Sequence, residues 1–304
     1  MLVDKPHGWT SHDVVARMRR LANTRKVGHA GTLDPMATGL LIIGIGSSTR
    51  LLTYIVGTDK EYLATVRLGA STTTDDAEGE RVTRARPNDM AAVTTDRIRQ
   101  ASARLTGDIQ QVPSSVSAIK VDGKRAYARV RGGEAVTLQP RQVTVSAFDI
   151  LDIVHVDENT AIDVSVRVEC SSGTYVRAIA RDLGADLGVG GHLTELRRTR
   201  VGPYRVADAA ELEGLDVATR LMTPANAASA LLGSVRLSQQ QAVDLGHGKK
   251  IAAPDSVAEG VGDGPVAAIA PDGRLVGLVE FHGGRGRVVV NFPADDVPAD
   301  EAPR

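Results

Sequence analysis

The chain has one cysteine, no long apolar run and no recognisable leader. The lone Cys170 excludes an internal disulfide, which fits a reducing compartment. No stretch of the 304 residues is apolar over the length needed to span a bilayer, and the first residues show no basic segment followed by an apolar one. We therefore expect a cytoplasmic protein without a signal peptide or membrane anchor.

Aromatic residues and metal-ligand patterns are also scarce. Aromatics make up 3% of the chain, so few side chains can stack on a nucleobase, and Tyr62, Tyr127 and Tyr175 stand out as candidates. The seven histidines have no metal-ligand spacing, and there is no GxxxxGKS or GxxxxGKT loop for a nucleotide phosphate. The sequence therefore argues against metal chemistry and against a P-loop enzyme.

Charge is balanced overall but unevenly distributed. Thirty-six Lys and Arg stand against 37 Asp and Glu, a net charge of −1, whereas a nucleic-acid-binding protein normally carries a basic surface. The segment 109–142 contains six basic and two acidic residues, a net +4. The basic residues form three clusters: Arg17, Arg19, Arg20, Arg25 and Lys26; Lys120, Lys124, Arg125, Arg129, Arg131 and Arg141; and Arg197, Arg198 and Arg200. We interpret these clusters as a localised polyanion surface on a neutral protein.

Hydrophobic periodicity indicates a mixture of strands and helices. Helices are expected at 11–22, with Ser11 as N-cap, at 96–107, at 174–188 and, followed by a loop, within 194–204. Strands are expected at 40–46, 62–69, 143–156 and 161–170, and short β runs separated by Gly, Asp and Pro follow from residue 234. This order predicts an α+β protein with a small C-terminal all-β module.

The stretch GHAGTLDPMATGLL, residues 28–41, holds one carboxylate in a restrained frame. Asp34 precedes Pro35, which pushes its backbone toward an extended conformation, and Gly31 and Gly39 permit turns on either side. An Asp-Pro pair beside Thr and Gly is also a common structural turn. By itself the stretch therefore leaves two interpretations open, an ordinary turn and a presented catalytic carboxylate.

Five blocks in the chain resemble the TruB family of tRNA pseudouridine synthases, in the family's order. The blocks are LVDKPHGWTSHDVV (2–15), the Asp34 stretch, DKEYLATVRLG (59–69), the basic QVPSSVSAIKVDGKRAYARVRGGEAV (111–136) and CSSGTYVRAIARDLG (170–184). Five ordered blocks are far harder to obtain by chance than one motif. The basic block is similar to the inserted RNA-gripping loop of the bacterial, stand-alone members.

The resemblance implies a fold and a domain plan. It implies a pseudouridine-synthase domain over 1–228, with a mixed, mainly antiparallel sheet flanked by helices and an inserted RNA-binding loop at 109–142. The β runs at 229–294 resemble the PUA domain that such synthases carry for RNA binding. The polar, proline-rich residues 295–304 are expected to be disordered.

The resemblance also assigns roles to individual residues. Asp34 is the implied catalytic carboxylate, Tyr62 stacks on the target base and accepts the proton from its carbon 5, and Arg177 pairs with Asp34. An adjacent guanidinium depresses a carboxylate pKa and holds its orientation. The implied substrate-binding residues are His29, which fills the gap left by the flipped base, Tyr175, Leu196, Arg50, Lys124, Arg125 and Arg129. Asp76 matches a family acidic position, for which we expect a structural role.

The implied reaction is the isomerisation of the T-loop uridine at tRNA position 55, without guide RNA. Breaking and remaking the bond between sugar and base needs no redox step, so no metal or cofactor is expected. Asp34 could attack the sugar, attack carbon 6 of uracil or remove the 2′-proton, and the sequence does not choose. Two alternatives remain: a guide-RNA-dependent synthase of the archaeal and eukaryotic kind, which the basic segment 109–142 disfavours, and a non-catalytic RNA-binding protein. A tRNA-remodelling activity could accompany catalysis. We expect tRNA as the partner, no obligatory protein partner and a monomer.

Overall fold

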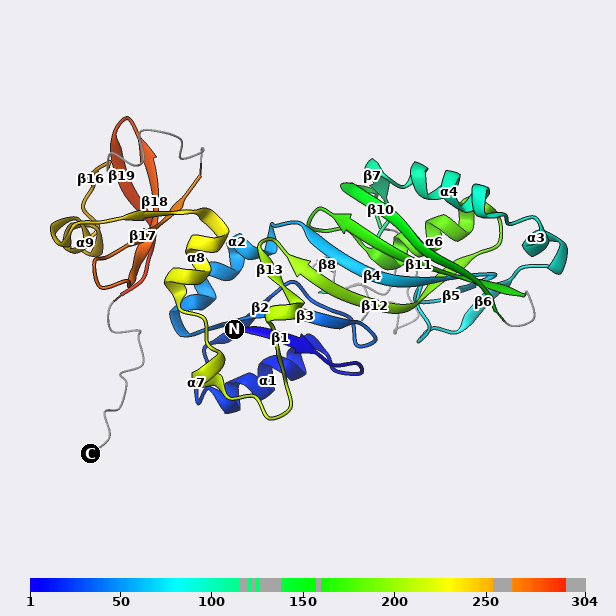
Figure 1. Ribbon diagram of the computed structural model, residues 1–304, viewed down its shortest axis with the longest axis horizontal. Coiled ribbons are helices and arrows are strands. Elements are labelled where there is room, and N and C mark those ends of the chain that lie inside the picture. Colours follow the sequence, from blue (N-terminus) through cyan, green and yellow to red (C-terminus); the bar gives the residue numbers. More distant parts are fainter. Residues whose placement is uncertain (115–119, 122–123, 126–137, 157–159, 254–263, 294–304) are drawn as a thin grey trace.

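The computed structural model describes residues 1–114, 120–121, 124–125, 138–156, 160–253 and 264–293 (Figure 1). Ten of the described strands form one long sheet, and five form a smaller sheet toward the C-terminus. Helices lie against the long sheet, and α8 (Pro224–Leu232) lies between the two sheets (Figure 1). The predicted α+β class is therefore confirmed.

The long sheet is mainly antiparallel, as predicted. Its strands follow the order β14 (Ala210–Glu211), β1 (Leu2–Lys5), β3 (Thr38–Ile45), β12 (Gly191–Val201), β4 (Lys60–Leu68), β11 (Ala161–Cys170), β10 (Arg141–Val156) and β7 (Gly107–Gln111). Beside this path, β2 (Val27–Ala30) pairs with β3, and β13 (Tyr204–Arg205) pairs with β12. Among the described pairings of this sheet, β1 with β14 and β3 with β12 are parallel. The β3–β12 pairing brings the start of β3, shortly after Asp34, against the C-terminal half of β12.

One face of the long sheet covers the main core. In β4, alternate side chains from Lys60 to Leu68 are buried, the period of 2 expected when one face of a strand meets a core. This face packs against α6 (Val176–Leu187) and α4 (Thr95–Arg104), which complete the main apolar cluster. The same face carries Tyr62, so the core leads directly to the predicted site.

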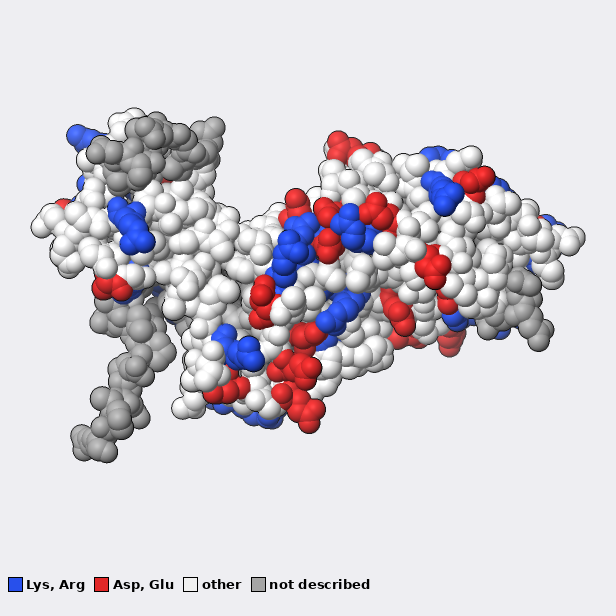
Figure 2. Space-filling model, in the orientation of Figure 1, with Lys and Arg blue, Asp and Glu red and all other residues white. Residues whose placement is uncertain are grey.

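The opposite face carries paired charges. Figure 2 shows acidic and basic side chains interleaved over β4, β11 and β12. The pairs include Arg167 with Glu61 at 2.9 Å and with Asp149 at 2.6 Å, Arg200 with Glu169 at 3.4 Å, and Arg197 with Asp4 at 2.6 Å. The predicted polyanion surface at Arg197, Arg198 and Arg200 is therefore wrong: two of these arginines are ion-paired, and Arg198 is buried on the other face. The acidic partners lie on distant segments, which the local sequence could not reveal.

Most of the expected elements are present close to their predicted bounds. These are α1 (Ser11–Leu21), α4, α6, β3, β4, β10 and β11. The other elements outside the smaller sheet are η1 (Gly46–Leu51), α2 (Leu52–Val56), β5 (Ala70–Thr72), β6 (Arg81–Arg84), α3 (Pro87–Ala91), β8 (Lys120–Val121), β9 (Lys124–Arg125), η3 (Val206–Asp208) and α7 (Val217–Arg220). Within the basic segment 109–142, the described strands β8 and β9 pair antiparallel.

Helix α1 begins one residue earlier than its predicted cap implies. Its N-cap is Thr10, whose hydroxyl accepts from the Asp13 backbone N–H at 3.1 Å, while the Asp13 carboxylate accepts from the Thr10 N–H at 2.9 Å. This reciprocal pair is a capping box. Ser11 is the first helical residue, and its hydroxyl instead bonds both the N–H and the carbonyl of Leu33. The predicted cap was wrong, and the residue ties α1 to the Asp34 loop.

Residues 191–201 form strand β12, so the helix predicted within 194–204 is wrong. The strand has irregular register against β4 between Leu193 and Glu195 and again between Arg198 and Arg200. These irregularities break the simple alternation of burial: the buried residues are Gly191, His192, Leu193, Leu196, Arg198 and Val201. The stretch therefore lacks the period of 2 by which a strand is recognised. Good helix formers in the same stretch added to the error, and tertiary pairing overrode them.

The smaller sheet is attached to the rest of the chain by a continuous apolar cluster. Its strands follow the order β15 (Ser234–Arg236), β17 (Val266–Ile269), β18 (Leu275–His282), β19 (Arg285–Asn291) and β16 (Ile251–Ala252), and α9 (Gln239–Gly246) packs on it. Ile42 and Tyr204 share one buried cluster with Ala228 of α8 and Leu278 of β18. The hydroxyl of Tyr204 also donates to the Ala227 carbonyl at 2.7 Å. The predicted β runs are present, and α9 is an additional helix that the pattern missed.

We expect Gly39→Ala to destabilise the fold at the base of the Asp34 loop. Gly39 has φ +98°, and an added Cβ would lie 2.3 Å from the Arg198 carbonyl oxygen. Strain and a backbone clash together should lower the free energy of unfolding by at least about 3 kcal/mol, measured in urea. The control is Gly46→Ala, at φ +60° with no atom within 4 Å of the new Cβ, which should lose about 1 kcal/mol. Equal losses would contradict this account of Gly39.

Candidate active site

A pocket of about 300 Å³ opens where the Asp34 loop, β4, β12 and the start of α6 meet. Asp34 and Tyr62 line it together with Arg177, Tyr175 and Leu196, so five of the predicted site residues converge. They come from four segments far apart in the chain. The pocket is therefore a product of the tertiary fold.

The loop that presents Asp34 is fixed on both sides of the carboxylate. Gly31 adopts φ +79°, which a residue with a side chain would rarely adopt. After Asp34, the Pro35 carbonyl accepts from the Gly8 N–H at 2.9 Å and from the Lys5 ammonium at 3.3 Å. Before it, Leu33 is bonded to Ser11. The backbone of Asp34 is thus anchored at both neighbours, which supports a presented carboxylate over an ordinary turn.

Arg177 holds two carboxylates at once. Its Nε lies 3.0 Å from Asp34 Oδ2, and its Nη1 lies 3.5 Å from Asp76 Oδ2. Nη1 also donates to the Thr74 carbonyl at 2.9 Å. The arginine and Asp76 side chains are about 5% exposed, whereas Asp34 keeps 38% of its side chain open toward the pocket. The predicted pairing of Arg177 with Asp34 is present, and Asp76 is a partner of the same guanidinium.

Burial and neighbouring charges oppose one another at Asp34. Burial is the largest influence and raises the pKa of its carboxyl, the Arg177 guanidinium lowers it, and the nearby Asp76 carboxylate raises it again. The Lys5 ammonium lowers it by a smaller amount. The net direction is upward, so Asp34 is a stronger base than an exposed aspartate while its arginine still favours the charged form.

Tyr62 forms the buried side of the pocket. It is 7% exposed, and burial raises the pKa of its phenol, so the hydroxyl is neutral at physiological pH. Arg198, opposite Tyr62 in the β4–β12 pairing, is 1% exposed and donates to the Leu40 carbonyl at 2.8 Å and the Gly31 carbonyl at 3.0 Å. Lys60 lies beside them, and burial followed by the charge of Arg198 lowers its pKa to about 8. A fixed positive charge thus lies behind the ring of Tyr62.

Two of the other predicted substrate residues, His29 and Arg50, do not line this pocket. His29, in β2, is partly buried with its Nδ1 unpartnered, and its ring lies edge-on to His12, with centroids 5.8 Å apart. Arg50 lies on η1, donates to the Asn291 carbonyl and sits 6.0 Å from the Phe292 ring, so it joins the two sheets and does not line the pocket. Lys124 and Arg125 form β9, and Arg129 lies outside the described residues.

Three basic residues at or beside the site were not predicted. These are Lys5, Lys60 and Arg198. Lys5 and Lys60 stand in the matching blocks 2–15 and 59–69, which could have drawn attention to them. Arg198 was assigned to a surface cluster, and only its position on the inner face of β12 reveals its function.

The described part of the chain offers neither a metal centre nor a membrane-spanning helix. Among its residues, no group of three or more His, Cys, Asp or Glu side chains is arranged to hold a metal ion. None of its helices combines the length and apolarity needed to cross a bilayer.

The chain matches the models of a known enzyme family. The family model described as "TruB family pseudouridylate synthase (N terminal domain)" matches residues 19–176. The models "tRNA pseudouridylate synthase B C-terminal domain" and "tRNA Pseudouridine synthase II, C terminal" match 177–236 and 232–293. The chain belongs to the TruB family of pseudouridylate synthases. It is therefore an isomerase, and the resemblance noted in the sequence is confirmed.

Curated relatives and solved structures agree with this assignment. The chain is 63% identical over 297 residues to the tRNA pseudouridine synthase B of Leifsonia xyli subsp. xyli (98% of this chain, 97% of the relative). It is 56% identical over 309 residues to that of Arthrobacter sp. strain FB24 (100% and 98%). Its fold is similar to a chain in the structure of an H/ACA RNP bound to a substrate RNA containing 2′-deoxyuridine, with TM-score 0.69, 25% identity and coverage of 98% of this chain and 86% of that one.

Proposed function

We propose that this protein is a stand-alone tRNA pseudouridine synthase that isomerises the T-loop uridine at tRNA position 55. The observation that carries the proposal is the Asp34–Arg177 ion pair at the pocket that Tyr62 and Leu196 line. The relatives named tRNA pseudouridine synthase B support tRNA as the substrate. The T-loop position and the mechanism are inferred from the resemblance and the geometry.

Substrate capture requires the uridine to leave its stack. Flipping costs a few kcal/mol, and the pocket offsets it by placing the base between apolar side chains such as Leu196 and the Tyr62 ring. We propose that His29 occupies the space that the base leaves in the RNA. Its ring lies edge-on to that of His12 and is only partly buried, which leaves part of the ring open to RNA.

Catalysis then follows from three groups. The bond between N1 of uracil and C1′ of ribose breaks, the base turns, C5 bonds to C1′, C5 loses its proton and N1 gains one. Asp34, held by Arg177, acts as nucleophile or base at the sugar or base. Because burial keeps the Tyr62 phenol neutral, we expect its hydroxyl to relay the C5 proton rather than to carry a lasting negative charge.

The pH dependence should report the charge of Asp76. Removing this negative charge in Asp76→Asn should lower the pKa of Asp34, because Asp76 raises it in the native protein. More Asp34 is then ionised at acidic pH, and the acid limb of the single-turnover rate moves to lower pH. The position of the limb, not the maximal rate, is the readout. Asp163→Asn, which breaks a pair with Arg67 on the opposite face, is the control. An acid limb that stays in place or moves upward would contradict the proposed electrostatics.

The basic segment 109–142 is proposed to clamp phosphates of the tRNA. Neutralising Lys124, Arg125 and Arg129 together should weaken tRNA binding and flatten its salt dependence. Each lost phosphate contact should reduce the log–log salt slope by roughly 0.7 to 0.9. Affinity is measured across a salt series with Asp34→Asn protein, which prevents turnover. An unchanged slope would show that these charges contact solvent alone.

The remaining assignments are proposals of the same kind. We propose a catalytic part over 1–228, an RNA-binding PUA-like part over 229–294, a cytoplasmic monomer and no obligatory protein partner. The tail 295–304, expected to be disordered, lies outside the described residues. A tRNA-remodelling activity would follow from the need to open the T-loop, and refolding of misfolded tRNA by Asp34→Asn protein would test it.

The decisive experiment uses the purified chain alone with an unmodified tRNA transcript. Pseudouridine is then mapped at single-nucleotide resolution. The proposal predicts one product, at position 55, without added guide RNA or protein, and no product with Asp34→Asn. Product only after guide RNA and partner proteins are added would support the guide-dependent alternative. Pseudouridine at another tRNA position would agree with the family assignment but would contradict the proposed T-loop position.

A further inference from the structure

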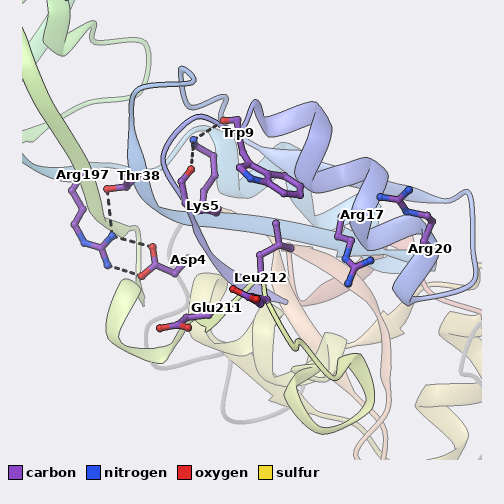
Figure 3. Close-up of a pocket in the computed structure, with 11 residues that line it drawn as sticks. Asp4, Lys5, Trp9, Arg17, Arg20, Thr38, Arg197, Glu211 and Leu212 are labelled. Atoms are coloured by element: carbon purple, nitrogen blue, oxygen red, sulfur yellow. Dashed lines mark hydrogen bonds and ion pairs between the residues drawn. The ribbon is translucent and has the colours of Figure 1, made fainter. Parts of the chain in front are cut away.

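Figure 3 shows the residues that line a second cavity, of about 590 Å³. This cavity lies on the opposite face of the long sheet from the catalytic pocket. Arg197 and Arg198 show the separation, because consecutive residues of a strand point to opposite faces. Arg198 lines the catalytic pocket, and Arg197 lines this second cavity. We call the second cavity the back pocket. No step of the proposed reaction uses it.

One wall of the back pocket is cationic. Arg17 and Arg20 lie three residues apart on α1, so they are neighbours on one helix face. Neither guanidinium group makes a hydrogen bond or ion pair with any described residue. On the sheet face that carries the back pocket, Arg167, Arg197 and Arg200 are all ion-paired. Two adjacent unpaired guanidinium groups therefore distinguish this wall.

The facing wall is acidic. Glu211 lies beside Asp4 in the parallel β1–β14 pairing, and Glu213 follows two residues later. Asp4 is neutralised by two contacts with Arg197, at 3.0 and 2.6 Å. The structure gives the carboxylate of neither glutamate a hydrogen-bond or ion-pair partner among its described residues. Two free carboxylates therefore face two free guanidinium groups across a cavity that keeps them too far apart to pair.

An aromatic plane lies between these walls. Trp9, the only tryptophan of the chain, is 37% exposed, and Figure 3 shows its ring and Leu212 between the arginines and Glu211. Its backbone is fixed, because its carbonyl accepts from the Lys5 ammonium at 2.6 Å and Thr10 after it caps α1. A large, partly exposed aromatic ring on a fixed backbone is suited to stacking against a ligand.

We propose that the back pocket binds a nucleotide whose base carries an exocyclic amino group. The base would stack on Trp9, the phosphate would meet Arg17 and Arg20, and the amino group would donate to Glu211 or Glu213. Uracil has no exocyclic amino group, and its two carbonyl oxygens would be repelled by the carboxylates, so we expect the acidic wall to favour adenine, cytosine and guanine. The back pocket therefore has the opposite base preference from the catalytic pocket. The nucleotide can come from an RNA or from the free pool.

Trp9 is itself the reporter of binding, because no other tryptophan contributes to fluorescence. Titration with AMP and CMP should quench this fluorescence at lower concentration than UMP, and inorganic phosphate alone should have little effect. Free tryptophan amide corrects for light absorbed by the nucleotide. The double variant Arg17→Ala/Arg20→Ala should weaken AMP binding at least about tenfold. Arg99→Ala, an exposed arginine on α4, is the matched control and should bind AMP as the wild type does.

Two further measurements complete the test. Glu211→Gln/Glu213→Gln should remove the preference for AMP over UMP while keeping the quench. If the double arginine variant also loses affinity for tRNA, and AMP competes with tRNA, the back pocket binds a nucleotide of the RNA. If the tRNA affinity of this variant is unchanged, the back pocket binds a free nucleotide. Absence of quenching by all nucleotides, equal response to AMP and UMP, or quenching that persists in the arginine variant overturns the proposal. These readouts do not depend on turnover, so failure here leaves the proposed isomerase function standing.

Discussion

Asp34→Asn should abolish pseudouridine formation, lowering turnover by about three orders of magnitude or more, while tRNA affinity stays within a few-fold. The amide keeps the shape of the carboxylate but is neither nucleophile nor base. The structure indicates that the variant will fold, because Arg177 keeps Asp76 at 3.5 Å and the Thr74 carbonyl at 2.9 Å as partners. The buried guanidinium of Arg177 therefore keeps an ion-pair partner and a hydrogen-bond acceptor after the substitution.

The measurement is single-turnover conversion of a T-loop transcript, with tRNA affinity determined separately. Asp163→Asn is again the matched control, since its carboxylate pairs with Arg67 at 2.7 Å on the far face of the sheet. It should retain full turnover. Residual activity of Asp34→Asn above a few per cent of wild type would show that Asp34 is not the catalytic carboxylate, whatever the affinity of the variant for tRNA.

Tyr62→Phe should lower turnover by about two to four orders of magnitude, with little change in binding. The substitution keeps the buried ring that contacts the base and removes the hydroxyl that we propose to relay the C5 proton. Because the phenol is buried and its pKa is raised, its loss removes a proton relay and no resting charge. The damage should therefore appear in the chemical step.

Two companion variants separate stacking from proton transfer. Tyr62→Leu removes the ring as well, and it should weaken capture of the flipped base in addition to turnover. Tyr54→Phe, on α2 and outside the pocket lining, should behave as wild type. A fully active Tyr62→Phe enzyme would show that the hydroxyl is dispensable and would leave Tyr62 with a stacking role alone.

Local sequence was a good guide where local forces set the structure. The alternation in β4 and β11 and the apolar periodicity of α1, α4 and α6 each predicted an element that is present. Asp34 could be singled out because Pro35 and the flanking glycines restrict the backbone around it. Strand β12 could not be predicted, because its irregular pairing with β4 breaks the alternation of buried side chains that identifies a strand.

The composition of the site depended on contacts between distant segments. We expected Asp76 to be structural, but it shares the guanidinium of Arg177 with Asp34, and that proximity influences the pKa of the catalytic group. Arg50, which we predict to contact the RNA, also bonds the Asn291 carbonyl, a contact that the local sequence does not indicate. Arg198 was expected on the surface, yet it is buried behind Tyr62. Each partner lies many residues away, where no local pattern could indicate it.

The sequence by itself determined the α+β class, the five ordered blocks and the carboxylate of Asp34, because backbone restriction and hydrophobic period act between neighbouring residues. The tertiary structure alone decided which charges meet. It placed Arg197 and Arg198 on opposite faces of β12, so that one is ion-paired with Asp4 and the other lies behind the catalytic ring. It also left Arg17 and Arg20 facing Glu211 across an open cavity. Coulomb energy and desolvation depend on distance and burial, and a linear sequence specifies neither.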